Sequence, residues 1–321
     1  MGKTSIEWTD VSWNPIVGCT EISPGCANCY AARLAATRLK NTPQYKGLAT
    51  HARATVGDSG IILRSDKVLP RWTGEVRSVL GIDPKVLEEP LHWRKPRRIF
   101  VCDMGDLFHE SVEHHDLVSI FSVMHRCQHH TFQILTKRAD RMKAWFERFA
   151  KGNYQNVWAG VSVENQLFAD KRIPLLLQTP AVAVRWISAE PLLGPLDLQR
   201  FQEHLPPAVH FGWLDGIDWL VCGGESGANA RPMHPNWARS LRDQCQAAGV
   251  KFFFKQWGEY VAPEQNVCAL HSCGAHDYVA DGREHTKGCP NAKQFVVKVG
   301  KKKAGRLLDG REWSGFPQVT P

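Results

Sequence analysis

Three cysteines lie in one short loop near the N-terminus and have the type and spacing of metal ligands. Cys19, Cys26 and Cys29 follow the pattern Cys-x6-Cys-x2-Cys. Electron carriers hold a 4Fe-4S cluster with four cysteine thiolates, so a compact set of three predicts a cluster whose fourth iron takes an exogenous ligand. Cys26-x2-Cys29 is also a typical half-site for structural zinc. A zinc knuckle with a fourth ligand from elsewhere in the chain is therefore the alternative.

A second group of metal-ligand residues lies near the C-terminus, in a Gly-rich stretch with few apolar residues. Their spacing suits one tetrahedral zinc ion, and a metal would stabilise a segment that lacks a core of its own. The alternative is free thiols in an insertion without a metal. The proposed ligands are Cys268, Cys273, His285 and Cys289, with His271 and His276 as substitutes.

The elements that must position these residues follow from an alternation of apolar runs and helical patterns. Runs that read as strands buried on both faces are typical of a parallel sheet, and the segments between them carry apolar residues at helical spacing. The strands are expected at 98–102, 131–135, 157–161, 184–188, 218–222 and 251–254, with a first one near 11–17, and the helices at 112–126, 139–150, 166–177 and 235–248.

This pattern predicts an α/β fold, a partial (β/α) barrel of about six or seven parallel strands with insertions. A doubly wound open sheet is the alternative. We expect a barrel core at residues 1–259, with an insertion at about 40–96, and a Cys/His-containing extension with a basic tail at 260–321.

Polar residues directly follow most of the predicted strands. Both candidate folds place their chemistry at the carboxyl ends of parallel strands, so we expect these side chains to face one rim. Glu164, Glu190 and Lys137 are the candidate catalytic residues, and Asp103 is a weaker one because it could cap a turn. The candidate cofactor-binding residues are Gly223, Gly224, Glu225 and Ser226, although Glu225 could instead pair with Arg231.

The composition indicates a soluble cytoplasmic protein with a polyanionic partner. No apolar stretch approaches the roughly 18 residues of a membrane span, and the polar start has no signal-peptide core. Ten cysteines without such a signal fit metal ligation and buried thiols. The charge of +8 and the basic residues between Lys298 and Arg311 favour nucleic acid, with Trp313 placed to stack on a base. An ordinary basic enzyme with a solvated tail is the alternative.

The cysteine loop resembles a variant of the radical S-adenosylmethionine (SAM) loop. That loop usually has the form Cys-x3-Cys-x2-Cys at the end of the first barrel strand, whereas six residues separate Cys19 from Cys26 here. Most of the chain resembles the phage Gp37/Gp68 family of three-Cys-motif proteins. The segments that carry this second resemblance are SWNP at 12–15, DLFH at 106–109, LTKR at 135–138, VSVEN at 161–165, SAEPL at 188–192, GGES at 223–226 and FKQWGE at 254–259.

The radical SAM resemblance implies an enzyme that cleaves SAM to a 5'-deoxyadenosyl radical, which abstracts a hydrogen atom from a substrate. It implies a 4Fe-4S cluster on Cys19, Cys26 and Cys29, and an electron donor such as flavodoxin or ferredoxin. With the basic charge, it favours modification or repair of a nucleic-acid base or nucleotide, with or without a partner protein. A hydrogen-atom donor could be Cys102 or Cys222, although each is more typical of a core residue. The rival hypothesis is a non-catalytic, zinc-stabilised nucleic-acid-binding protein.

Overall fold

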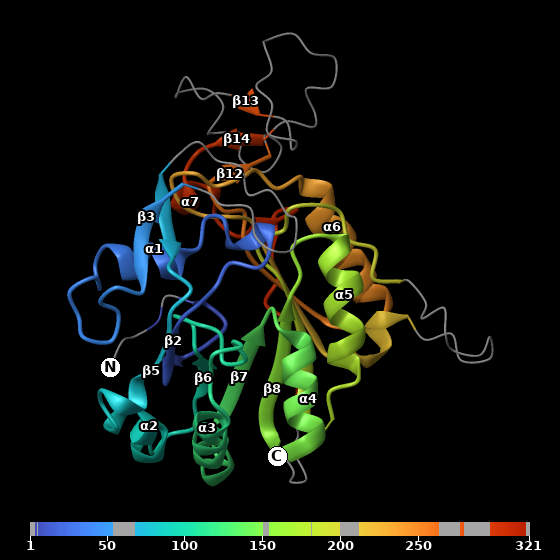
Figure 1. The fold of residues 1–321 in the computed structure, drawn as a ribbon. Coiled ribbons are helices and arrows are strands. Elements are labelled where there is room, and N and C mark those ends of the chain that lie inside the picture. The colour runs from blue at the N-terminus through green and yellow to red at the C-terminus, as the bar shows by residue number, and fades with distance from the viewer. Residues whose placement is uncertain are drawn as a thin grey trace. The chain divides into compact units, whose positions relative to one another are not determined.

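The computed structural model describes residues 4, 6–53, 68–149, 154–180, 182–199, 212–262, 277–278 and 296–318. Figure 1 shows the order of the elements along the chain. The strands are β1 Val11–Trp13, β2 Ile16–Gly18, β3 Ala49–Ala52, β4 Leu69–Trp72, β5 Val76–Ser78, β6 Arg98–Val101, β7 Thr131–Thr136, β8 Tyr154–Ser162, β9 Val182–Ala189, β10 Trp219–Gly223, β11 Lys251–Gln256, β12 Tyr260–Val261, β13 Asp277–Tyr278, β14 Val296–Lys298, β15 Leu307–Leu308 and β16 Arg311–Glu312.

The α-helices alternate with the longer strands. They are α1 Tyr30–Ala36, α2 Lys85–Glu88, α3 His114–Arg126, α4 Ala139–Phe149, α5 Gln166–Leu177, α6 Pro235–Ala247 and α7 Lys301–Ala304. Four 3-10 helices complete the set: η1 Pro24–Cys26, η2 Val79–Gly81, η3 Glu89–His92 and η4 Trp213–Gly216.

Seven strands form one sheet in the order β1-β6-β7-β8-β9-β10-β11. The registers of β1 with β6, β6 with β7, β7 with β8, β9 with β10 and β10 with β11 are all parallel. The predicted α/β fold, a partial barrel of six or seven parallel strands, is therefore confirmed. The six strands expected after residue 97 and the four expected helices are present, with ends shifted by at most a few residues.

Burial explains why these runs become strands of this sheet. Every residue of β10 is buried, as are the last seven residues of β8. Helices pack on both faces of a parallel sheet, so both sets of alternating side chains must be apolar. The seven-stranded sheet therefore forms where the sequence has unbroken apolar runs.

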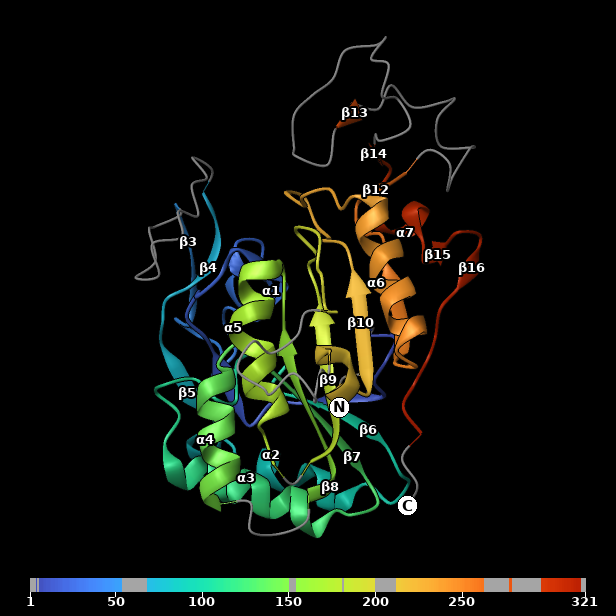
Figure 2. The same cartoon turned by 90° about the vertical axis from the view of Figure 1, so that its right-hand side faces the viewer.

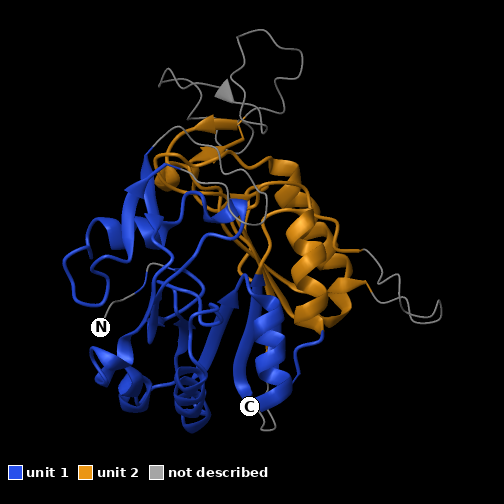
Figure 3. Ribbon diagram, viewed as in Figure 1, with its two compact units in different colours: residues 1–161, 178–185 blue, residues 162–177, 186–321 orange. Residues whose placement is uncertain are grey.

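The chain divides into two compact units (Figure 3): residues 1–161 with 178–185, and residues 162–177 with 186–321. In the first unit, α3 and α4 bury one apolar face each. Phe121 of α3 meets Trp145 and Phe146 of α4, with ring centroids 5.2 and 5.4 Å apart. These large aromatic contacts fix α3 and α4 against each other.

In the second unit, α6 packs along β10 and β11, as Figure 2 shows. Its buried residues Ala238, Leu241 and Cys245 recur at helical spacing. Nearby, the Trp219 indole N–H of β10 donates to the Gly315 carbonyl at 2.8 Å. The same unit contains the small sheets β12-β14-β13 and β15-β16.

The described part of the expected insertion contains the short helices η2, α2 and η3 and the strands β3, β4 and β5. The predicted boundary between residues 259 and 260 stays a prediction. Of the helices in the described ranges, none combines the length and apolar composition that a membrane span requires.

Candidate functional site

The cysteine loop begins where the first strand of the chain leaves the large sheet. Pro15, which lacks an N–H group, separates β1 from β2. The next residues return to β6, because Gly18 forms an isolated parallel bridge with Gly105 and its N–H donates to the Met104 carbonyl at 3.0 Å. A Cβ on Gly18 would lie 2.3 Å from the Glu75 carbonyl oxygen, and its φ is +89°. Only glycine fits there, and it places Cys19 beside the carboxyl end of β6.

Cys26 and Cys29 lie on one tight turn. Pro24 begins η1, the Cys26 N–H donates to the Ser23 carbonyl at 2.9 Å, and the Cys29 N–H donates to the Cys26 carbonyl at 3.2 Å. Cys29 is the residue that precedes α1. Beneath the loop, Ala31 and Ala35 of α1 pack in a core cluster with Val17 and Met104. The turn that carries Cys26 and Cys29 therefore continues into a helix that packs on a core cluster.

Burial has the largest effect on the pKa values of Cys19 and Cys29. Burial raises the pKa of Cys19, and the neighbouring Cys26 and Cys29 raise it further. Burial also raises the pKa of Cys29, against the lowering effects of the Ala32 and Ala31 backbone N–H groups and of the Lys137 ammonium. Backbone N–H groups and cations that favour a thiolate also suit a cysteine ligated to a metal cluster.

The three side chains are of the residue type that binds an iron-sulfur cluster, and backbone N–H groups and a guanidinium lie around them. In the described ranges, no group of three or more His, Cys, Asp or Glu side chains is arranged so that it could hold a metal ion. The assignment of Cys19, Cys26 and Cys29 as ligands therefore stays a proposal.

Arg138, directly after β7, links the cysteine loop to the ends of β6 and β7. Its guanidinium donates to Asp106 at 3.1 Å and to both Glu110 oxygens at 2.8 Å. It also donates to the Thr20 carbonyl at 3.5 Å and to Cys19 Sγ at 3.7 Å. Burial lowers the pKa of Arg138, but the surrounding anionic groups, Asp106 first, outweigh that effect and raise it. The group is therefore a fixed positive charge beside Cys19.

His109 forms hydrogen bonds on the other side of the cysteine loop's Thr20, which Arg138 also contacts. Its Nδ1 accepts from the Ser111 N–H at 3.1 Å, so its Nε2–H donates to the Thr20 hydroxyl at 2.8 Å. Burial lowers the pKa of His109, and the Arg138 charge adds to that effect. The imidazole is therefore neutral and supports the residue next to Cys19.

The carboxyl end of β6 is tied to the turn after β1. Asn14 Nδ2 donates to Asp103 Oδ1 at 2.6 Å, and Asn14 Oδ1 accepts from the Met104 N–H at 3.1 Å. The Tyr30 hydroxyl donates to the Asp103 carbonyl at 2.8 Å. Burial raises the pKa of the Asp103 carboxyl, against the hydrogen bonds that lower it. The segment at 12–15 thus has a structural role in fixing the loop.

In the second unit, two of the candidate residues are in ion pairs at strand ends. Glu164 is fully buried and accepts from Arg172 at 2.9 Å. Glu190 pairs with Lys255 at 3.0 Å and accepts from the Ser188 hydroxyl at 3.4 Å. The ends of β9, β10 and β11 therefore share one polar cluster around Glu190, whereas Glu164 is held in the protein interior.

The Gly223–Ser226 segment follows β10. A Cβ on Gly223 would lie 2.7 Å from Glu190 Oε1, and one on Gly224 would lie 2.0 Å from the Trp257 carbonyl oxygen. Glu225 accepts from the Arg231 backbone N–H at 2.8 Å and from its guanidinium at 2.9 Å. The pairing with Arg231, which was the alternative for Glu225, is present. Gly224 allows the close approach of Trp257, directly after β11, and Gly223 leaves room for the Glu190 carboxylate. A cofactor-binding role for the segment stays a prediction.

The remaining sequence predictions concern Cys102, Cys222 and the C-terminal region. Cys102 and Cys222 are buried, as expected of core residues. The Arg311 and Arg242 guanidinium groups lie 3.6 and 5.4 Å from the centre of the Trp313 ring. At least part of the ring surface is therefore covered by protein. The proposed zinc ligands lie outside the described residues: Cys268, Cys273, His285 and Cys289, with His271 and His276.

Sequence reasoning chose Lys137 and missed its neighbour Arg138. Lys137 lies close enough to Cys29 to lower the pKa of that thiol, although burial has the larger, opposite effect. The signal for Arg138 was its position two residues after the end of β7, within the LTKR segment at 135–138. Asp106 and His109 belong to the DLFH segment at 106–109. Only the fold shows that these three meet beside Cys19.

Comparisons with known proteins identify a family but no activity. A family model described as "Protein of unknown function (DUF5131)" matches residues 3–317. No curated protein matches the chain.

Two solved structures are similar to this chain. A mutant spore photoproduct lyase with bound AdoMet and dinucleoside spore photoproduct aligns with 89% of this chain and 67% of that one, at 10% identity and a TM-score of 0.37. A spore photoproduct lyase complexed with dinucleoside spore photoproduct aligns with 90% and 68%, at 9% identity and a TM-score of 0.32. Likeness at these scores carries no argument about function.

Proposed function

The chain belongs to the DUF5131 family, whose description assigns no activity, and we propose from its residues that it is an iron-sulfur enzyme of the radical SAM type. The observation that carries the proposal is the placement of the cysteine loop. Cys19, Cys26 and Cys29 follow the first strand of a parallel sheet, with Cys19 next to the bridge between Gly18 and Gly105 and Cys29 directly before α1. Chemistry in such sheets lies at the carboxyl ends of strands.

The proposed roles of the chain's residues follow from their contacts. Cys19, Cys26 and Cys29 would hold a 4Fe-4S cluster, and Arg138, which donates to Cys19 Sγ, would orient that ligand and offset its charge. The backbone N–H groups of Ala31 and Ala32 would support the Cys29 thiolate. When bound and reduced, the cluster would supply the electron that cleaves SAM into methionine and a 5'-deoxyadenosyl radical.

The strand-end residues supply the proposed binding groups for SAM and substrate. Gly223, Gly224, Glu225 and Ser226 are the proposed SAM contacts, and Glu164, Glu190 and Lys137 the proposed catalytic residues. Glu190 and Lys255 form an ion pair at the strand ends. A carboxylate and an ammonium group side by side suit a zwitterionic or polar ligand. Glu164 is paired and fully buried, so any role of Glu164 would act through Arg172.

The proposed substrate class is a nucleic-acid base or nucleotide, with modification or repair as the reaction. The net charge of +8 supports a polyanionic partner, and the three lysines 301–303 of α7 are exposed. Flavodoxin or ferredoxin would be the electron donor.

The test is reductive SAM cleavage by anaerobically reconstituted protein. With dithionite as reductant, wild-type protein should release 5'-deoxyadenosine and methionine, measured by liquid chromatography. The Cys26→Ala variant should release neither, whereas Cys245→Ala, which changes a buried thiol of α6, should cleave SAM like wild type. Zinc without iron in the wild-type protein would instead support the non-catalytic binding protein.

A further inference from the structure

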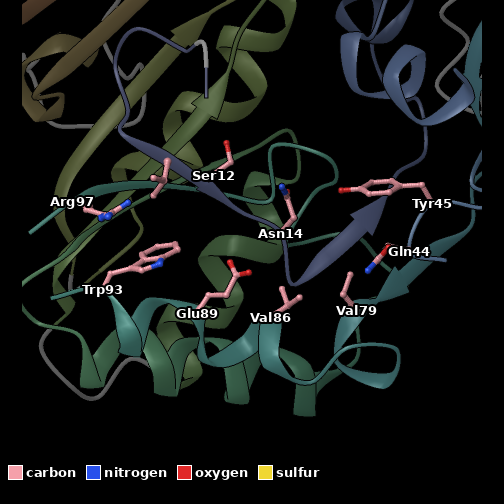
Figure 4. A pocket seen from close by; sticks show the side chains of 10 residues that line it. Ser12, Asn14, Gln44, Tyr45, Val79, Val86, Glu89, Trp93 and Arg97 are labelled. Carbon is pink, nitrogen blue, oxygen red and sulfur yellow. The ribbon is translucent and has the colours of Figure 1, made fainter. Parts of the chain in front are cut away.

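The first unit contains a cavity of about 500 Å³ in which no cysteine takes part. It lies beside β1, which is the edge strand of the large sheet. Val11 of β1, Val79 and Val86 give it apolar surface, and Tyr45, Glu89 and Trp93 line it as well. In Figure 4 the Glu89 carboxyl points toward the middle of this space, with Trp93 on one side and Tyr45 across from it.

Within the described ranges, polar groups that form no hydrogen bond or ion pair line this cavity. Trp93 is only 4% exposed, yet its indole N–H has no hydrogen-bond partner. Within the described ranges, the Glu89 carboxylate forms no hydrogen bond or ion pair, and burial raises its pKa. The Arg97 guanidinium lies 5.3 Å from the centre of the Trp93 ring, and it too forms no ion pair there. Buried donors are almost always satisfied in proteins, so the Trp93 indole N–H indicates a ligand, and Glu89 and Arg97, which are partly buried, line the same cavity.

The pattern of these groups defines the ligand chemistry. Glu89 offers two acceptor oxygens, and Trp93 and Arg97 offer donors on the wall of the same cavity. Tyr45, Trp93 and the valines offer flat and apolar surface for a planar ring system. Guanine has this complement, since its N1–H and amino group are adjacent donors and its O6 and N7 are acceptors on the neighbouring edge.

We propose that this cavity is a binding site for a guanine base, presented as a nucleotide or an unpaired residue of a nucleic acid. Glu89 accepts from the guanine N1–H and amino group, and the indole N–H of Trp93 and the Arg97 guanidinium donate to its acceptor edge. Unpaired bases are commonly read in this way, by stacking and by hydrogen bonds to their edges. The site goes beyond the proposed radical chemistry, because none of its residues is a proposed cluster ligand.

Asn14 connects the cavity to the rest of the first unit. It lines the space and also donates to Asp103 at the end of β6. Its amide already forms hydrogen bonds with Asp103 and with the Met104 N–H. Asn14 therefore lines the cavity but does not recognise the base. The discriminating acceptor is therefore Glu89.

The test is isothermal titration calorimetry with GMP, IMP, AMP and CMP, which share one phosphate and differ in the base. We expect GMP to bind most tightly, IMP more weakly because it lacks the amino donor, and AMP and CMP at least about tenfold more weakly than GMP. Glu89→Gln should weaken GMP binding by about tenfold or more and Trp93→Phe by a smaller factor. Glu88→Gln, which removes the same charge from the exposed neighbour, should bind GMP like wild type.

Three results would overturn the assignment: no GMP binding at millimolar concentration, equal affinity for all four nucleotides, or equal effects of Glu89→Gln and Glu88→Gln. Binding of free methionine with displacement of GMP would assign the cavity to a zwitterionic amino acid instead. The titration is done on both Cys26→Ala and wild-type protein. Absence of SAM cleavage by the wild-type protein with GMP binding intact would refute the proposed function alone, and SAM cleavage by the wild-type protein without GMP binding would refute this site alone.

Discussion

Replacing Arg138 with glutamine tests the network that supports Cys19. The substitution removes the charge that pairs with Asp106 at 3.1 Å and with Glu110 at 2.8 Å. The side chains of Arg138 and Asp106 are only 4% and 7% exposed, whereas that of Glu110 is 65% exposed. The two ion pairs should therefore contribute very differently.

The expected loss in free energy of unfolding follows from those exposures. Leaving one charge of a buried pair without its partner costs about 3 to 5 kcal/mol, whereas an exposed pair contributes about 0 to 1 kcal/mol. Asp106 keeps the Thr136 hydroxyl at 2.7 Å and the Phe108 N–H at 3.0 Å, which favours the lower end. We expect a loss of about 3 kcal/mol, a large share of the stability of roughly 5 to 15 kcal/mol that is typical of a domain.

The assay is urea unfolding of the metal-free protein, followed by tryptophan fluorescence. Arg98→Gln is the matched control, because Arg98 pairs with Asp10 at 3.2 Å but the two side chains are 34% and 44% exposed, so its loss should stay within about 1 kcal/mol. Adding Asp106→Asn to Arg138→Gln should recover part of the loss, since the uncompensated charge is gone. A loss below about 1 kcal/mol in Arg138→Gln, or one equal to that in Arg98→Gln, would refute the reasoning.

Three further predictions follow. Gly224→Ala should lower the free energy of unfolding by about 1 to 3 kcal/mol, because the new Cβ would lie 2.0 Å from the Trp257 carbonyl oxygen. Gly223→Ala should lower it less, because its Cβ would meet the movable end of the Glu190 side chain. Equal losses for the two variants in urea unfolding would contradict this difference. The folded-state pKa of His109 lies below its ordinary value of 6.5, so the unfolded chain binds the proton first and the free energy of unfolding should fall as the pH drops below about 6.5. In the His109→Asn variant the free energy of unfolding should fall less steeply with pH, and an unchanged slope would contradict the role of His109. Cys26→Ala should lose reconstituted iron while keeping the wild-type circular dichroism spectrum, and wild-type iron content in that variant would remove Cys26 from the ligand set.

The large sheet was predictable because its strands are unbroken apolar runs between amphipathic helices. Near the N-terminus, one strand was expected at 11–17, and two are present. Pro15 interrupts the hydrogen bonding, and the return of Gly18 to Gly105 is a contact between residues 87 positions apart. No local pattern contains such a contact.

The cysteines and the strand-end residues of the candidate site could be predicted from the sequence, but the side chains with which they form hydrogen bonds and ion pairs could not. Whether Glu225 turns to Arg231 or to a ligand depends on side-chain positions that spacing alone leaves open. The same holds for Glu164, which pairs with Arg172 of α5, eight positions along the chain. Arg138 was missed because its role comes from Asp106 and Cys19, which are 32 and 119 residues away.

The central claim is an iron-sulfur cluster on Cys19, Cys26 and Cys29 with one iron open to SAM. The most direct measurement is the electron paramagnetic resonance spectrum of anaerobically reconstituted, dithionite-reduced protein, with and without SAM, alongside its iron and sulfide content. We predict about four irons and four sulfides per chain, as in a 4Fe-4S cluster, and a reduced-cluster signal that changes when SAM is added. Protein that retains zinc and takes up no iron, or a cluster signal indifferent to SAM, would contradict it.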